Sequence, residues 1–263
     1  MIYLQSGFAP DPDLNHARIG YQNLAFGLTP TTSSAATGHP AIAATYPTTF
    51  EFWQPTTLPA TWVVDLGSAK AVDYLGMVGD MEGCTVALQS SAETPTGEGS
   101  WTTQETRTGL TDRINLFLIA PVTARYWRLS ITVAIPRLAV AYIGQTLAMQ
   151  RKIYQGHTPL TLSRETELSN NMSEGGQYLG RSIIRKGAST STDWQHLKAA
   201  WYRANFDPFV KSAREYPFFI GWRPQQYPSE LGFVWTGGDI APDNSGPRDF
   251  MSVGMTFRGL INE

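Results

Sequence analysis

The chain has 263 residues and a formal net charge of −2, with 42% hydrophobic and only 16% charged residues. Binding to a nucleic-acid backbone needs clustered Lys and Arg, and the sequence has no basic run, so we expect no nucleic-acid partner. No run approaches 18 apolar residues, which excludes a membrane-spanning helix, and we expect no membrane insertion.

The residue types favour short strands joined by turns over a helical bundle. Gly (24 residues) and Pro (17) are plentiful, and the 8 Trp, 11 Tyr and 12 Phe need large surfaces to cover them. The single cysteine, Cys84, excludes an intrachain disulfide framework and is expected to be a buried thiol. The first residues lack a basic segment followed by a long apolar one, so we expect no signal peptide.

Along the first half, strand patterns follow one another with no helical segment between them. Residues 1–28 form an arm of mixed polarity, and residues 29–49 are rich in Thr, Ser, Ala and Pro, as loops are. Strands are expected at residues 61–67, 72–78, 84–90, 114–119, 126–133 and 138–143. This spacing predicts an antiparallel β-sandwich or jelly roll.

The pattern changes after about Ala148. A Ser-Thr-Asp segment at 191–193 provides capping groups for a helix predicted over 193–205, where apolar residues recur at helical spacing. An Asp-Pro pair starts a second predicted helix over 207–216. Extended segments are expected at 153–162, 177–186, 218–222, 232–235 and 251–257. Residues 148–263 are therefore predicted to form an α+β assembly domain, to which the N-terminal arm adds a strand.

Four segments of the first half occur in a characteristic order. They are W-V-V-D-L-G at 62–67, a hydrophobic strand at 72–78, V-A-L-Q-S-S at 86–91 followed by Trp101, and R-Y-W-R-L at 125–129. In this order they resemble the discoidin-like, galactose-binding-like family, the coagulation-factor C-type module. The resemblance implies a jelly-roll β-sandwich over residues 29–147 and a structural hydrogen-bonding role for Asp65. Arg125 and Arg128 flank a core strand and are expected to make structural pairs.

The sequence departs from this family where the family binds its ligands. Members that bind calcium or sugar carry an A-x-D-G segment before the first Trp, and the corresponding stretch, residues 44–53, has no Asp-Gly pair. The four histidines also lack the spacing of a zinc site; they are His16, His39, His157 and His196. We therefore expect no metal and no cofactor.

A second resemblance extends over the whole chain. It is carried by N-H-A-R-I-G-Y at 15–21, F-E-F-W at 50–53, L-A-M-Q-R at 147–151, G-G-Q-Y-L-G at 175–180, A-W-Y-R-A-N-F-D-P-F at 200–209 and W-R-P at 222–224. These segments resemble tail and minor tail proteins of long-tailed bacteriophages. The resemblance implies that the second half has a tail-tube-like or distal-tail-like fold, a β-sandwich with a flanking helix that assembles into rings. It predicts a structural subunit of the virion's tail tip, with copies of itself in a ring and other phage tail proteins as partners.

Candidate glycan contacts lie where loops meet at the ligand end of a discoidin-like sandwich. Carbohydrate sites combine an exposed aromatic face with polar side chains that bind hydroxyl groups. The residues that fit this description are Tyr46, Phe52, Trp53, Gln54, Asp80, Glu82, Trp101 and Arg107. The alternative that Phe52 and Trp53 are core or interface residues stays open, because this is the usual fate of large aromatic side chains.

Aromatic residues of the second half are candidates for contacts between subunits. Those on the predicted helices or beside prolines give stiff surfaces suited to fixed contacts. The candidate interface residues are Trp201, Phe209, Trp222, Tyr227 and Trp235.

Together these features predict a non-enzymatic structural subunit of a phage tail tip, with an outward-facing sandwich that contacts cell-surface glycans. The acidic residues are scattered rather than paired, and the sequence has neither a nucleophile elbow nor a phosphate-binding Gly-rich loop. Two alternatives stay open. One is a carbohydrate-binding host-receptor module of the virion, and the other is a glycan-cleaving tail enzyme with two acids in one cleft.

Overall fold

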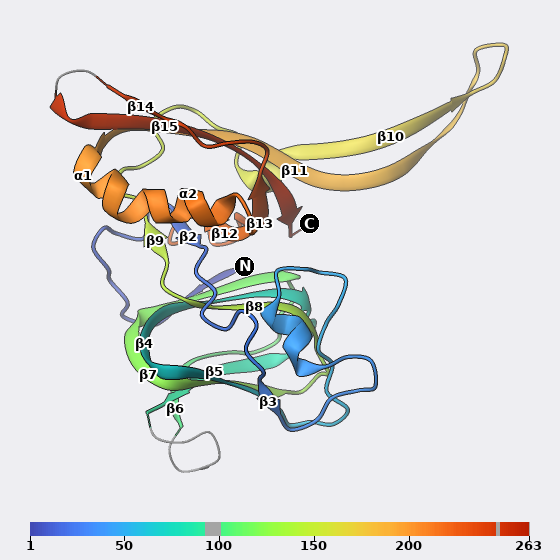
Figure 1. Cartoon of the computed structure of the whole chain (residues 1–263). Coiled ribbons are helices and arrows are strands. Elements are labelled where there is room, and N and C mark those ends of the chain that lie inside the picture. The colour runs from blue at the N-terminus through green and yellow to red at the C-terminus, as the bar shows by residue number, and fades with distance from the viewer. Residues whose placement is uncertain (93–100, 246–247, 263) are drawn as a thin grey trace.

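The computed structural model describes residues 1–92, 101–245 and 248–262. Its strands form two sheets, and a ribbon of two strands projects away from them (Figure 1). The predicted mostly β fold class is confirmed. Among the described residues, no helix has the length and apolar character that crossing a membrane requires.

The first sheet folds over itself into a β-sandwich, because two of its strands are long and take part in both layers. Its described strands are β1 (Ile2–Leu4), β3 (Thr31–Thr32), β4 (Ala60–Asp80), β5 (Thr85–Ser91), β6 (Thr102–Arg107), β7 (Ile114–Thr132) and β8 (Arg137–Gly144). Strands β4 and β7 pair along most of their length; β3, β5 and β6 extend one layer, and β1 and β8 the other. The strands predicted at 61–67 and 72–78 are thus one strand, and so are those at 114–119 and 126–133.

A bulge allows β4 to pass from one layer to the other. The register with β7 shifts between Asp65 and Lys70, and Gly67 in this stretch has a φ of 76°, a conformation that favours glycine. The Arg125 guanidinium donates two hydrogen bonds of 2.8 Å to the Asp65 carboxylate, which also accepts the Gly67 N–H at 2.8 Å. These hydrogen bonds, those from Arg125 above all, hold the pKa of Asp65 below its ordinary value. The structural roles predicted for Asp65 and Arg125 are confirmed.

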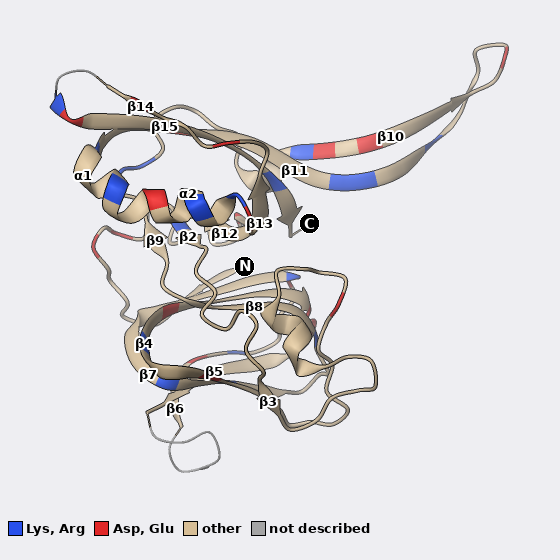
Figure 2. Cartoon of the chain, in the orientation of Figure 1, with Lys and Arg blue, Asp and Glu red and all other residues tan. Residues whose placement is uncertain are grey.

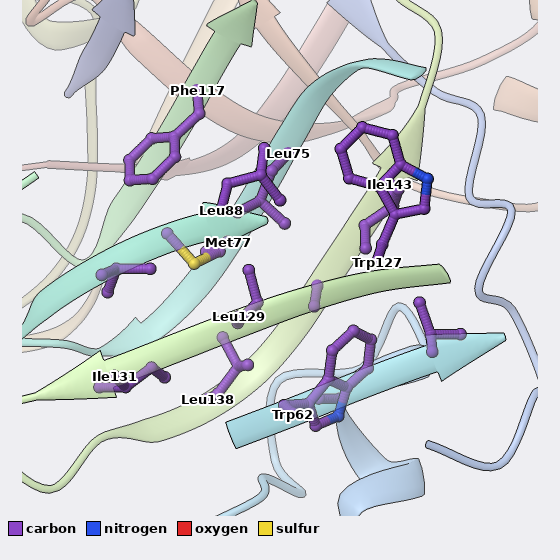
Figure 3. Close-up of a cluster of buried hydrophobic side chains, with 14 of the residues drawn as sticks. Trp62, Leu75, Met77, Leu88, Phe117, Trp127, Leu129, Ile131, Leu138 and Ile143 are labelled. Atoms are coloured by element: carbon purple, nitrogen blue, oxygen red, sulfur yellow. The ribbon is translucent and has the colours of Figure 1, made fainter. Parts of the chain in front are cut away.

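The sandwich is filled by buried apolar side chains from both layers (Figure 3). They include Trp62, Leu88, Trp127, Leu129 and Ile131 from one layer and Leu75, Met77, Phe117, Leu138 and Ile143 from the other. Full burial of one such side chain contributes roughly 1.5–3 kcal/mol. This core fixes the strands whose ends carry the candidate site.

The second sheet carries a helical segment on one face. Its described strands are β2 (Arg18–Gly20), β9 (Leu147–Ala148), β10 (Arg164–Met172), β11 (Tyr178–Lys198), β12 (Phe218–Gly221), β13 (Leu231–Thr236), β14 (Pro242–Asn244) and β15 (Phe250–Ile261). The helical segment consists of α1 (Ala199–Trp201), a π turn (Tyr202–Phe206) and α2 (Asp207–Ala213), and short 3₁₀ turns occur at Ala41–Thr45 and Leu160–Leu162. The rings of Phe209 and Phe218 meet edge to face at 4.9 Å and join the helix to the sheet.

The helix predicted over 193–205 is wrong in its first turn and a half. Strand β11 continues to Lys198, and the helix begins only at Ala199. Residues 188–194 alternate between buried and exposed while they pair with β15, which is a strand period. A bulge between Trp194 and Leu197, where His196 has a φ of 59°, puts both apolar side chains on the buried face and imitates helical spacing.

A third apolar cluster joins the two sheets. Tyr142 of the sandwich meets Phe219 of β12 and Phe233 of β13 edge to face, with ring centroids 5.5 and 6.0 Å apart. A Cβ on Gly76 would lie 2.5 Å from the Phe219 ring, so glycine is needed for this close approach. The N-terminal arm takes part in both sheets, because β1 pairs with β7 and β2 pairs with β12. The two halves of the chain therefore share a core.

Candidate functional site

A hollow of 440 Å³ opens at the end of the sandwich where β4 ends and β8 begins. The loop before the first long strand and the segment that leads into β7 complete its wall. Its lining consists of Thr49, Phe50, Phe52, Gly79, Asp80, Met81, Glu82, Thr111, Asp112, Arg113, Arg137 and Ala139. The hollow therefore draws on four stretches that are far apart in the sequence.

Backbone contacts fix the relative positions of these stretches. The N–H of Trp53 donates to the Leu138 carbonyl at 2.8 Å, and the N–H of Leu138 donates back at 2.9 Å, which attaches the aromatic loop to β8. The N–H of Gly79 donates to the Arg113 carbonyl at 3.0 Å. A Cβ at position 79 would lie only 2.1 Å from the Arg137 carbonyl oxygen, so any larger residue there would push β4 and β8 apart.

Two aromatic rings form one wall of the hollow. The Phe50 side chain is 76% exposed, which is unusual for phenylalanine. Phe52 is half-buried; it stacks on the His39 ring at a centroid distance of 4.1 Å, and the Arg137 guanidinium lies 5.8 Å from its centroid. Phe52 is thus held in place, while Phe50 leaves an apolar face open to solvent.

Charged groups of both signs line the rest of the hollow: Asp80, Glu82 and Asp112 with Arg113 and Arg137. The Asp112 carboxylate lies 3.2 Å from the ammonium group of Met1, and burial lowers the pKa of that ammonium although Asp112 acts in the opposite direction. Carboxylates accept and guanidinium groups donate hydrogen bonds, so the hollow offers both partners that a sugar hydroxyl needs. Among the described residues, no group of three or more His, Cys, Asp or Glu side chains could hold a metal ion.

The hollow brings together three of the residues proposed as glycan contacts, Phe52, Asp80 and Glu82. The structure contradicts the prediction that Trp53 contacts glycan. Its side chain is fully buried, and its indole N–H donates to the Ser34 carbonyl at 3.1 Å, so it cannot contact a ligand. Tyr46 instead packs edge to face against Phe26 at 5.7 Å, and Gln54 does not line the hollow.

Trp101 and Arg107 also lie away from the hollow. The Trp101 ring is covered by the Arg128 guanidinium at 4.4 Å, and Arg107 donates to the Leu4 carbonyl at 2.6 Å. Sequence reasoning missed Phe50, Arg113 and Arg137. For Phe50 a signal existed, because it belongs to the same F-E-F-W segment as Phe52. For Arg113 and Arg137 the sequence contained no such signal, since only the fold brings these two residues to the hollow.

The candidate interface residues differ in exposure. The structure contradicts the prediction that Phe209 contacts another subunit, because its ring is fully buried in the second core. Trp201 is half-buried and packs on the same core. Trp222 stacks on Tyr227 with ring centroids 5.2 Å apart, and Trp235 is 46% exposed. Surface is thus available at Tyr227 and Trp235, but these two are not joined to the hollow.

No family model and no curated protein matches the chain. Solved structures with similar folds include carbohydrate-binding modules. Chitosan-binding module 1 of a chitosanase/glucanase from Paenibacillus sp. IK-5 is 23% identical with a TM-score of 0.43; 47% of this chain and 99% of that chain are covered. Module 2 of the same enzyme, in complex with chitotriose, is 20% identical with a TM-score of 0.42 (47% and 100%). The family 32 module of Clostridium perfringens NanJ, in complex with galactose, is 14% identical with a TM-score of 0.40 (48% and 98%).

Proposed function

We propose that the sandwich of this chain binds carbohydrate in the hollow and catalyses no reaction. The observation that carries the proposal is the exposed Phe50 ring beside carboxylates and guanidinium groups at one end of a rigid sandwich. A sugar presents an apolar face of C–H groups and a rim of hydroxyls. The first packs on an aromatic ring, and the second hydrogen-bonds to charged side chains.

A titration of the intact chain tests this proposal. A glycan array, followed by calorimetry with galactose and chitotriose, is expected to give saturable binding. Replacement Phe50→Ala removes the open aromatic face and is expected to weaken binding about tenfold, the equivalent of about 1.4 kcal/mol. Glu82→Gln removes a charged acceptor and should weaken binding as well.

Tyr154→Ala is the matched control, because Tyr154 is an aromatic residue that is 59% exposed outside the hollow. It should bind sugar as the unchanged chain does. Absence of binding to every glycan on the array would refute the proposal. Release of reducing sugar ends by the intact chain would instead make it a glycan-cleaving enzyme.

We propose as a second role that the chain is a structural subunit of a bacteriophage tail tip. This role is favoured by the ribbon of β10 and β11, which extends far beyond the other strands of the second sheet and exposes apolar side chains. In such a particle the ribbon would join subunits and the sandwich would face the host surface. Labelling of intact tails with an antibody against the chain is expected to mark the tip; labelling of no tail component would refute the role.

A further inference from the structure

The ribbon of β10 and β11, called the arm here, has no partner within its own chain along most of its length. It spans residues 164–187, where β10 and β11 pair with each other; the second half of β11, from Ala188 to Lys198, pairs with β15. Nine residues of strand extend about 30 Å. Its exposed apolar side chains, 38% to 65% accessible, are Leu168, Met172, Tyr178, Leu179, Ile183 and Ile184. A two-stranded ribbon is marginally stable in water, and apolar groups on it indicate a surface that becomes covered.

One face of the arm is continuous with a groove at its base. Residues opposite each other in a ladder share a face, and Thr166 lies opposite Lys186, Leu168 opposite Ile183, and Met172 opposite Tyr178. The two register shifts of this ladder each add one residue on β11, at Ile184 and at Leu179, so β10 keeps its alternation. Residues 166, 168 and 172 are separated by even numbers along β10 and therefore lie on the same face. Thr166 and Lys186 line the groove.

The groove is the largest of the hollows described here, at 820 Å³. Its lining consists of Thr111, Asp112, Arg113, Thr161, Arg164, Thr166, Lys186, Gly187, Leu260, Ile261 and Asn262. The Asn262 side chain accepts the Ile114 N–H at 2.8 Å and donates to its carbonyl at 2.9 Å, so the end of β15 is fastened to the sandwich. The side of the groove that β15 and the sandwich form is therefore held in a fixed position.

The charges of the groove and of the arm's far end are opposite. Arg113, Arg164 and Lys186 line the groove together with one acid, Asp112, which lies 3.2 Å from the Met1 ammonium. The acids at the base of the arm, Glu165 and Glu167, pair with Arg258 and Arg185 at 3.3 and 3.1 Å. At the tip, residues 172–178 contain one acid, Glu174 in the turn, and no Lys or Arg. Figure 2 shows an acidic residue in this loop.

We propose that the tip of one copy's arm, residues 172–178, docks in the groove of a second copy. Met172 and Tyr178 would pack on Leu260 and Ile261, and the Glu174 carboxylate would approach Arg164. The groove lies at the base of the arm, and Figure 1 shows that the loop between β10 and β11 lies at the opposite end of the ribbon, so the contact requires another molecule. This head-to-tail contact joins different surfaces, which produces rings where the rotation closes. The inference rests on the tail-tip role and names a contact which that role needs; Thr111, Asp112 and Arg113 line both the groove and the glycan hollow.

Sedimentation of the full-length chain over a range of concentrations tests the contact. The unchanged chain is expected to self-associate. Glu174→Arg and Arg164→Glu should each weaken association about tenfold, and the double variant with both changes should recover most of it, since the charges are then exchanged. Tyr178→Ser should also weaken association. The matched control is Tyr154→Ser, because Tyr154 is a tyrosine outside the arm and the groove with 59% exposure against 63% for Tyr178.

The outcomes separate this contact from the proposed roles. If the unchanged chain stays monomeric at millimolar concentration, both the contact and the assembly role of the arm are refuted. If it associates and the arm and groove variants associate equally well, the contact is refuted, and the assembly role then needs another surface. Failure of the double variant to recover association would refute the pairing of Glu174 with Arg164. Because Thr111, Asp112 and Arg113 line both cavities, sugar binding is compared in dilute solution, where the chain is monomeric, and there it should be the same in all of these variants.

Discussion

Asp73 is an acid held at the junction of the two sheets. Its carboxylate accepts hydrogen bonds from the Thr146 N–H at 2.6 Å and from the Thr146 hydroxyl at 3.2 Å. Thr146 lies between β8 and β9, where the chain passes from one sheet to the other. Burial raises the pKa of Asp73 from 3.8 to about 6, although these hydrogen bonds and Arg18 act in the opposite direction. The folded protein thus holds a proton on Asp73 more tightly than the unfolded chain does.

The raised pKa makes stability fall as the pH rises. The contribution of Asp73 is complete below about pH 4 and is lost as the pH passes through about 6, because ionisation is harder in the folded state. A difference of about two pKa units corresponds to about 3 kcal/mol. We expect the free energy of unfolding of Asp73→Asn, measured by urea denaturation, to gain about this much relative to the unchanged chain between pH 4 and pH 8. Parallel pH profiles for the two proteins would contradict this.

Two neighbouring residues, Phe52 and Trp53, show how far the sequence alone can predict which side chains line a site. Phe52 and Trp53 were equivalent candidates by composition and position, yet Phe52 lines the hollow and Trp53 is fully buried. Successive residues of an extended chain point to opposite sides, so one of the two must face inward. Which one does so depends on the pairing of Trp53 with Leu138, a contact over 85 residues that no local pattern contains.

At the scale of elements, the alternation of apolar and polar residues located most strands but not the residues at which they begin and end. The segments 61–67 and 72–78 were predicted as separate strands, whereas the chain makes a bulge between Asp65 and Lys70 and continues as one strand. The helix start was misplaced for a related reason. The residues at 191–193, which can cap a helix, here pair with β15, and the bulge before Leu197 imitates a helical repeat. A bulge shifts the spacing of the buried residues along a strand, and this spacing was the main sequence feature on which the predicted elements rested.

The arm gives a prediction about local stability. Its backbone hydrogen bonds are exposed on both faces, so they should open without global unfolding. In dilute solution we expect amides of residues 165–171 and 179–185 to exchange hydrogen faster than those of β13, which is paired on both sides. At concentrations where the chain associates, the arm should become protected. Hydrogen exchange measured by mass spectrometry at two concentrations tests both statements, and slow exchange of the arm in a dilute monomer would contradict the first.

At the scale of the molecule, the sequence indicated two domains, and the structure has two sheets with a shared core. The third cluster combines Tyr74, Leu116 and Tyr142 of the sandwich with Phe219 and Phe233 of the second sheet. These side chains alternate with those of the two inner cores along each strand, so β4, β7 and β12 are apolar on both faces. Continuous apolar strands are typical of a sheet covered on both sides, but the sequence of such a strand does not identify the element that covers it.

Close contact between the sheets depends on Gly76. Its substitution by Ala would put a Cβ 2.5 Å from the Phe219 ring, and overpacking of this kind costs about 1–3 kcal/mol. Gly254 of β15 is the matched control, because a Cβ there would meet nothing within 4 Å. We expect Gly76→Ala to lower the free energy of unfolding by this amount and Gly254→Ala to leave it nearly unchanged. Equal effects of the two substitutions in denaturant titrations would contradict a tight junction.

The shared core has a consequence for how the whole molecule unfolds. Loss of the second sheet would expose Tyr74, Tyr142 and their neighbours on the sandwich, so neither half should be stable after the other has unfolded. We therefore expect a single cooperative transition, with tryptophan fluorescence and far-ultraviolet circular dichroism changing at the same denaturant concentration. Phe219→Ala, expected to cost about 3–5 kcal/mol, should shift both signals together. Two separate transitions in the unchanged chain would mean that the halves are independent domains that merely touch.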